Sequence, residues 1–205
     1  MAARALVIAI ENYPAAQGGF MQQHLAGTLE AGLKFRAWLQ EKWTNEGRSD
    51  SQLLLCTEPV RPGGRGANRA DIIESLEKLK ADGQNATEEL FFFFSGHGFS
   101  FAEGINSPRA DTIVSSDFAR AATSGPSCFR LDEIIYWLRG NLGPGRHYYF
   151  IDACRNQLDP RQIRVSAQLT MDAQSSAEAS TFVLKSTVEG AVAAVGGPFP
   201  KLLLA

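Results

Sequence analysis

The sequence predicts an α/β fold in which a mostly parallel central sheet carries helices on both faces. Short apolar runs with strand character alternate along the chain with stretches of helical period. Strands that alternate with helices are typical of parallel sheets with right-handed crossovers. A chain of 205 residues, 44% of them hydrophobic, is long enough to bury one such core. We therefore expect residues 1–205 to form a single domain.

The first half of the chain predicts two strands and two helices. Ala5 to Ile10 is a continuous apolar run, which is typical of a central strand. Apolar residues recurring every three or four positions predict a helix over residues 25–42, and residues 51–56 form a second strand. Residues 61–66 have the composition of a flexible loop and lack the ending of a phosphate-binding loop. Asn68 is placed to cap the next helix.

The second half continues the alternation and then becomes irregular. Residues 155–180 are polar and aperiodic, which predicts a long mobile connection. The apolar stretch 201–205 has no capping signal, so we expect the natural polypeptide to continue beyond it. The remaining predicted elements are strands at 90–94, 111–117, 148–151 and 181–184 and a helix at 131–138.

Composition and charge exclude several classes of protein. With 20 basic and 22 acidic side chains the net charge is −2, without the positive field that nucleic-acid binding needs. No apolar run is long enough for a secretory signal or a membrane span. Cys56, Cys128 and Cys154 cannot all pair and form no Cys-x-x-Cys, so neither a disulfide framework nor a zinc site is expected. We expect a cytoplasmic protein without nucleic-acid or membrane partners.

Two short strings place a base and a thiol at the ends of predicted strands. His97 lies between Gly96 and Gly98 after one apolar run, and Cys154 follows another. The carboxyl ends of parallel strands meet at one edge of the sheet. A free thiol is mostly protonated at neutral pH, so a nucleophilic cysteine needs a neighbouring base. The pair predicts a cysteine protease, with the amide N–H groups of Gly98 and Cys154 as a candidate oxyanion hole.

Other functions fit the sequence less well. A serine hydrolase centred on Ser95 would need a Gly-x-Ser-x-Gly elbow, which is absent. A cysteine phosphatase would need an arginine where Pro160 stands. A turn histidine and a core cysteine are common when taken singly, but here their contexts agree. A non-catalytic binding module with the same fold remains an alternative.

These strings resemble a known family. Residues 5–13, Ser95 to Gly98 and Asp152 to Arg155 are similar to the caspase-like clan, nearest to the bacterial metacaspase-type peptidases called orthocaspases. His97 precedes Cys154 by roughly the 50 residues of the caspase signature. The resemblance implies a caspase-hemoglobinase fold over nearly the whole chain and endopeptidase activity on protein or peptide substrates. It also implies regulated proteolysis in bacterial stress or defence, with a regulatory or effector protein as partner.

The resemblance also implies a substrate preference. Asp152 stands two residues before the nucleophile, where the family lines the S1 pocket and where an acid accompanies cleavage after Arg or Lys. A carboxylate there would bind a basic P1 side chain and repel an acidic one. Glu30 matches the position of a second S1 acid, although a solvated helix residue is an equal alternative. A non-basic P1 preference remains the alternative for the whole pocket.

Further assignments rest on softer matches. Ser115, Ser116 and Asp117 match a family position that lines the substrate cleft, or they simply form a turn. Some metacaspases need calcium, but Asp111 and Asp117 alone do not supply the roughly 6 to 8 oxygen ligands of a calcium site. We therefore expect no metal or other cofactor. If P1 is basic, the connection after the nucleophile is a candidate for self-cleavage at Arg155, Arg161 or Arg164.

Overall fold

The centre of the molecule is a five-stranded parallel sheet. The computed structural model describes residues 2–16, 21–82, 87–102, 109–119, 125–154, 156–157, 169 and 179–187. The strand order is β2-β1-β3-β7-β9, and every neighbouring pair is parallel. The strands are β1 (Ala2–Ile10), β2 (Gln52–Glu58), β3 (Thr87–Gly96), β7 (Arg146–Ala153) and β9 (Ser180–Lys185). The predicted parallel sheet is confirmed.

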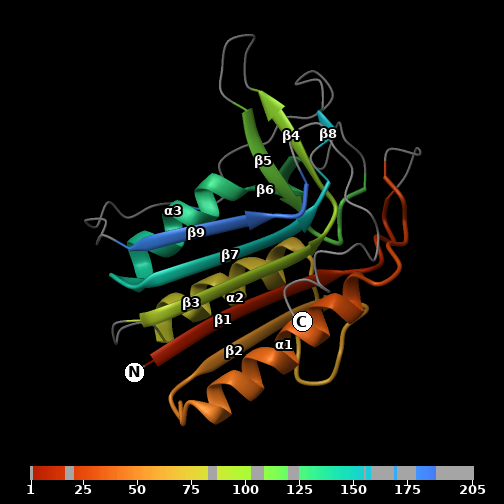
Figure 1. Cartoon of the computed structure of the whole chain (residues 1–205). Helices are drawn as coiled ribbons and strands as arrows, with labels where there is room; N and C mark the ends of the chain where they lie inside the picture. Colours follow the sequence, from red (N-terminus) through yellow and green to blue (C-terminus); the bar gives the residue numbers. More distant parts are fainter. Residues whose placement is uncertain are drawn as a thin grey trace.

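Helices cover both faces of this sheet, as predicted. The helix α1 (Thr28–Asn45) lies in front of the sheet in Figure 1, and α2 (Arg69–Asp82) and α3 (Leu131–Leu142) lie behind it. The α2 helix begins after Asn68, whose Oδ1 accepts the Asp71 N–H at 2.9 Å, so the predicted cap is confirmed. The α1 helix begins three residues later than predicted because Gly27, with φ 92°, breaks the helical path before it.

The core has two halves because each central strand is buried on both faces. On β1, Ala5 and Val7 pack with α1, while Leu6 and Ile8 pack with the cluster that contains α2 and α3. The consecutive phenylalanines of β3 divide in the same way: Phe91 and Phe93 face α1, and Phe92 and Phe94 face the other side. Continuous apolar runs in the sequence are thus explained by burial on both faces.

A second, smaller sheet projects from the carboxyl end of the first and was not predicted (Figure 1). Its order is β6-β5-β4-β8, with β4 antiparallel to β5 and β5 antiparallel to β6. The strand β4 begins at Gly98, directly after His97, so this sheet shapes the surroundings of that histidine. The elements are β4 (Gly98–Ala102), β5 (Arg109–Val114), the 3-10 turn η1 (Gly125–Ser127), β6 (Cys128–Arg130) and β8 (Asn156–Gln157).

Two loop predictions have different outcomes. The 61–66 loop, expected to be flexible from its composition, is tied to β2, because Arg65 N–H donates to the Leu55 carbonyl at 2.8 Å and the Arg65 carbonyl accepts Thr57 N–H at 3.0 Å. The predicted mobile connection 155–180 lies almost entirely outside the described residues, with Arg155, Arg161 and Arg164 among those not described. The same holds for residues 201–205, so these expectations stay predictions.

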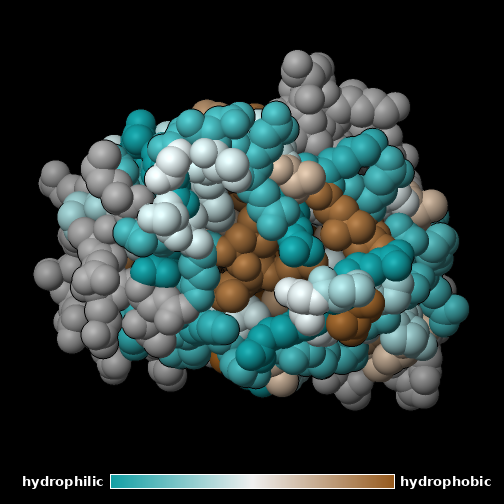
Figure 2. All heavy atoms as spheres, turned by 90° about the horizontal axis from the view of Figure 1, so that it is seen from below, coloured by the Kyte–Doolittle hydropathy of each residue, from teal (hydrophilic) through white to brown (hydrophobic). Residues whose placement is uncertain are grey.

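The surface near the β2 edge is mixed in character. Figure 2, which views the molecule from below, shows a narrow band of hydrophobic residues framed by hydrophilic ones. Among the described strands, β2 pairs with only one neighbour, β1, and its first three residues are only partly buried.

Within the described part of the chain, no helix combines the length and apolar character needed to cross a membrane.

Candidate active site

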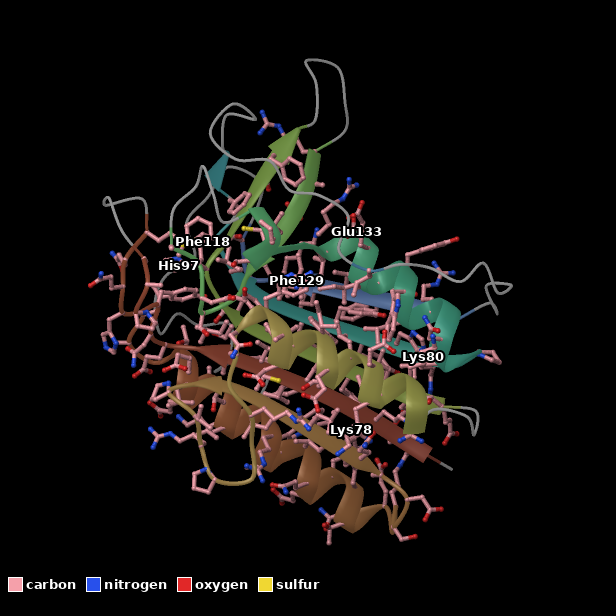
Figure 3. The ribbon with its side chains drawn as sticks, turned by 180° about the vertical axis from the view of Figure 1, so that it is seen from behind. Lys78, Lys80, His97, Phe118, Phe129 and Glu133 are labelled. Carbon is pink, nitrogen blue, oxygen red and sulfur yellow. The ribbon has the colours of Figure 1, made fainter. Side chains whose placement is uncertain are left out.

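The strand register brings the predicted base and nucleophile to neighbouring strand ends. Gly96, the last residue of β3, pairs with Ala153, the last residue of β7. His97 and Cys154 are the next residues on their strands, and neighbouring strands lie about 4.8 Å apart. The two backbones therefore leave the sheet side by side at its carboxyl edge. Figure 3 shows His97 at one end of the sheet, with Lys80 toward the other.

The chain passes close to Cys154 immediately after His97, and only a glycine fits there. A Cβ atom added to Gly98 would lie 2.9 Å from the Ala153 Cβ, 3.1 Å from the Cys154 carbonyl oxygen and 2.6 Å from the Thr112 carbonyl oxygen. In the structure the space around Gly98 is occupied by the protein's own backbone. The two proposed oxyanion donors, Gly98 and Cys154, therefore lie close together.

The contacts of the His97 ring define its protonation. Nε2 lies 2.8 Å from the carbonyl oxygen of Gln22. A carbonyl only accepts hydrogen bonds, so Nε2 carries the proton in the neutral ring and Nδ1 keeps its lone pair. Burial lowers the pKa of the half-buried His97 imidazole below its ordinary value, and the Gln22 contact opposes this in part. At neutral pH the ring is therefore an uncharged base whose accepting nitrogen is Nδ1.

Sequence reasoning missed the structural role of Tyr13. Its hydroxyl accepts a hydrogen bond from His97 N–H at 2.7 Å, and its ring lies 4.7 Å from the imidazole between centroids. The tyrosine is fully buried, and burial raises its pKa, so the phenol stays neutral. A signal existed in the sequence, since Tyr13 follows the first predicted strand and would reach the same sheet edge as His97.

Cys154 is half-buried and has a free thiol. The segment after β9 holds the end of its strand: Ser186 N–H donates to the Ile151 carbonyl, and Thr187 Oγ1 donates to the Ala153 carbonyl, each at 2.9 Å. The residues just before the proposed nucleophile are thus fixed from both sides, by β3 and by the end of β9.

Asp152 lies at the same edge, on the α1 face of the sheet. Its neighbour in register is Ser95, whose buried hydroxyl donates to Asp152 Oδ2 at 3.4 Å. The carboxylate is half-buried, and burial raises its pKa above the ordinary value, with the hydroxyls of Ser186 and Ser95 acting in the opposite direction. Ser95 is therefore a second member of this acidic site, and sequence reasoning considered it only as a nucleophile.

Glu30 lies in the first turn of α1, on an exposed part of the helix. Its carboxylate is 2.6 Å from Lys34 Nζ, and its side chain is 68% exposed. This is the geometry of a solvated i, i+4 pair. Its role as a second S1 acid stays a prediction.

Ser115, Ser116 and Asp117 form a bonded turn after β5. Ser115 Oγ lies 2.6 Å from Asp117 Oδ1 and 2.9 Å from the Ser127 carbonyl oxygen. Ser116 N–H donates to the Ala67 carbonyl at 2.9 Å, and Asp117 Oδ1 accepts the N–H of Arg69, the first residue of α2, at 3.2 Å. These contacts hold β5 to the start of α2. A role in substrate binding stays a prediction.

The remaining candidates for chemistry are fully buried or already bonded. Cys56 and Cys128 are fully buried. Of the two aspartates considered for calcium, Asp111 bonds Lys185 at 2.5 Å and Asp117 belongs to the turn just described. In the described ranges, no three His, Cys, Asp or Glu side chains converge as metal ligands would.

A cavity of about 630 Å³ lies at the opposite edge of the sheet. It is bounded by the end of α1 and the start of β2, with Trp43, Arg48, Ser51 and Leu53 among its lining residues. The strands begin at that edge, whereas His97 and Cys154 follow strand ends.

Comparison with known proteins agrees with this arrangement. A family model described as the caspase domain of C14 peptidases matches residues 2–199. A "probable protease" from a Desulfuromonadales bacterium is 28% identical over 158 residues, which are 74% of this chain and 18% of that protein. A crystal structure of a protein from Geobacter sulfurreducens superposes with a TM-score of 0.52 at 16% identity, covering 74% of this chain and 50% of the other. At that identity the superposition supports the fold alone.

Proposed function

Because this chain belongs to the caspase-domain family of peptidases, we propose that it is a cysteine endopeptidase that cleaves after Arg or Lys. The observation that carries the proposal is the register of β3 and β7, which sets His97 and Cys154 at adjacent strand ends with Asp152 just before the cysteine. The chain spans 18% of the length of its curated relative. The activity and partners of a complete protein are thus part of the proposal.

The proposed reaction uses Nδ1 of His97 as the proton acceptor. Nδ1 takes the thiol proton of Cys154, and Sγ attacks the scissile carbonyl carbon to form a C–S bond. The C–N bond then breaks as Nδ1–H gives its proton to the leaving amine, which leaves a thioester. Water attacks the thioester carbonyl with its proton passing to Nδ1. The C–S bond then breaks as Nδ1–H returns this proton to Sγ, which restores the thiol and releases the acid.

Backbone donors are proposed to stabilise the oxyanion of each tetrahedral intermediate. The candidates are the amide N–H groups of Gly98 and Cys154, supported by the close approach of the two backbones. One such donor typically contributes about 3 kcal/mol to the transition state. The Gln22 carbonyl holds Nε2–H throughout, so it supports the tautomer that the first proton transfer requires.

Asp152 is proposed to select the basic P1 side chain. Its carboxylate is half-buried beside Ser95, so an incoming guanidinium or ammonium would meet an acid with reduced solvent screening. A P1 aspartate would be repelled by the same group. The proposal involves no metal or other cofactor, and the substrate is a protein or peptide. Regulation by a partner protein in bacterial stress or defence is the biological setting that we propose.

Fluorogenic peptides with Arg, Lys or Asp at P1 test this function. The wild type should cleave the Arg and Lys peptides, and Cys154→Ala should abolish turnover because the nucleophile is gone. Cys56→Ala, which removes a buried thiol at a position in β2, is the matched control and should retain activity. Faster cleavage after Asp would refute the specificity, and equal rates with Cys154→Ala would refute the nucleophile.

A further inference from the structure

Three hydrogen bonds close a ring around the backbone of His97. The His97 N–H donates to Tyr13 Oη at 2.7 Å, and the Tyr13 hydroxyl donates to the Val114 carbonyl at 3.3 Å. The Val114 N–H in turn donates to the His97 carbonyl at 3.0 Å. Both backbone polar groups of His97 are thus held, and the only side chain in the ring is that of Tyr13. Its single hydroxyl joins the ends of β1, β3 and β5.

The backbone of Tyr13 also supports the partner of the imidazole. Tyr13 N–H donates to the Gln23 carbonyl at 2.8 Å, and Asn12 bridges to His24. These bonds fix the segment that carries Gln22, whose carbonyl lies 2.8 Å from His97 Nε2. Tyr13 therefore bonds the backbone of His97 directly, and it bonds Gln23, the residue next to the one whose carbonyl faces the His97 ring.

Position 96, directly before His97, has room for a glycine only. A Cβ atom added to Gly96 would lie 2.6 Å from Tyr13 Oη and 3.0 Å from Phe94 Cζ. Any larger residue at this position would push the hydroxyl away from the His97 N–H. Gly96 thus leaves the room that the Tyr13 hydroxyl needs in order to contact the His97 N–H.

We infer that Tyr13 is a positioning residue for His97: its hydroxyl fixes the turn that carries the imidazole, and its backbone places the carbonyl that orients the ring. The inference rests on the proposed peptidase function for its consequence. A misplaced imidazole would transfer the thiol proton less often, whereas the distant parts of the substrate would still bind. The expected signature is a loss in kcat with little change in KM.

The test compares Tyr13→Phe with Tyr149→Phe. Both tyrosines are fully buried in the same apolar cluster, but the Tyr149 hydroxyl has no hydrogen-bond partner among the described residues, so its removal controls for the loss of a buried hydroxyl. Tyr13→Phe should lower kcat about 10- to 100-fold with KM changed less than about 2-fold. Tyr149→Phe should leave both unchanged. A kcat for Tyr13→Phe equal to that of the wild type would overturn the inference.

A double-mutant cycle separates positioning from general loss of stability. Gly96→Ala should cost more activity in the wild type than in Tyr13→Phe, because the second background lacks the atom that the new methyl group would strike. Equal costs in the two backgrounds would contradict the assignment. Thermal unfolding of all four proteins shows whether the changes in kcat follow stability.

A readout without substrate keeps this inference distinct from the proposed function. If the wild type cleaves none of the peptides, the proposed function fails, and NMR of the His97 Cε1–H resonance still judges Tyr13. Its chemical shift and titration midpoint should change in Tyr13→Phe and stay constant in Tyr149→Phe. An identical His97 titration in all three proteins would overturn the role of Tyr13.

Discussion

At the scale of single residues, Asp152 connects the fold to the proposed specificity. Asp152 pairs with Ser95 in the register of β3 and β7, and it lies two residues before Cys154 in the sequence. Its carboxylate is held in part away from water, so its attraction for a cation is screened less than that of Glu30 on the exposed face of α1. The two acids should therefore contribute unequally to the recognition of a basic P1 residue.

Asp152→Asn should weaken cleavage after Arg. The loss of one charge-assisted contact is worth about 2 kcal/mol, or roughly a 30-fold fall in kcat/KM for an Arg peptide. A P1 Gln peptide should change little. The Glu30 carboxylate already pairs with Lys34, so Glu30→Gln should lower kcat/KM for the Arg peptide by less. Equal losses in the two variants would show that Glu30 shares the pocket.

The acid limb of the pH profile should reflect the environment of His97. Burial lowers its pKa, so the neutral imidazole persists to lower pH than an exposed histidine with a pKa near 6.5. We expect kcat/KM to fall only below about pH 6.5 as His97 becomes protonated. The measurement is best made in Asp152→Asn, which removes the second group that titrates on the acid side. An acid-limb midpoint above 6.5 would contradict a buried, uncharged base.

At the scale of elements, the junction of β3 and β4 holds His97 beside the end of β7, the strand that precedes Cys154. Gly98→Ala would place a methyl group against two backbone carbonyl oxygens and the Ala153 Cβ, none of which can move as a flexible side chain would. The variant should lose about 1–3 kcal/mol of unfolding free energy. Its peptidase activity should fall further than that loss explains, because His97 and Cys154 are pushed apart.

Gly47→Ala is the control for this variant. Gly47 has a φ of 65° with open space around it, so an added methyl group there costs about 1 kcal/mol through backbone strain alone. Chemical denaturation should show destabilisation of both proteins, while only Gly98→Ala loses activity after correction for the folded fraction. Full activity in Gly98→Ala would mean that the close approach does not position the site.

The same elements show what the sequence could and could not reveal. Apolar runs predicted all five strands of the parallel sheet, because burial on both faces leaves a strong signal. The strand predicted at 111–117 overlaps β5, but β4 and its pairing with β5 were missed, although Phe99, Ser100 and Phe101 alternate in hydrophobicity. The placement of His97 and Cys154 at one edge of the sheet was expected because each follows a predicted strand of a parallel sheet, but the pairing of β3 with β7 came only from the structure. The roles of Tyr13 and Gln22 were not predicted. The place of Tyr13 after the first strand indicates which sheet edge it reaches but not which group its hydroxyl contacts, and a backbone carbonyl such as that of Gln22 leaves no side-chain signal.

At the scale of the whole molecule, a buried histidine links stability to pH. His147 is fully buried on β7, and burial lowers its pKa to about 4. Within the part of the chain that the structure describes, neither ring nitrogen has a hydrogen-bond partner. In the unfolded chain the pKa is about 6.5. Between these values the unfolded state binds a proton that the native state does not. The contribution of the uncharged His147 to the free energy of unfolding is therefore fully present above pH 6.5 and falls as the pH drops toward 4.

The expected loss over that window is about 3 kcal/mol, from a shift of roughly 2.5 pKa units. His147→Leu removes the titrating group while keeping a similar volume, so its unfolding free energy should depend less on pH between 6.5 and 4. His24→Gln, at an exposed position, should follow the wild type. Parallel curves for the wild type and His147→Leu, measured by urea denaturation at several pH values, would show that His147 does not couple folding to acid.

The most direct measurement is mass spectrometry of the protein treated with a peptide electrophile that carries Arg at P1, beside its aspartyl counterpart. The account predicts one adduct, on Cys154, formed faster with the arginyl reagent and strongly slowed in His97→Ala and Asp152→Asn. An adduct on another residue, or faster labelling of Cys154 by the aspartyl reagent, would contradict the proposed site and its preference.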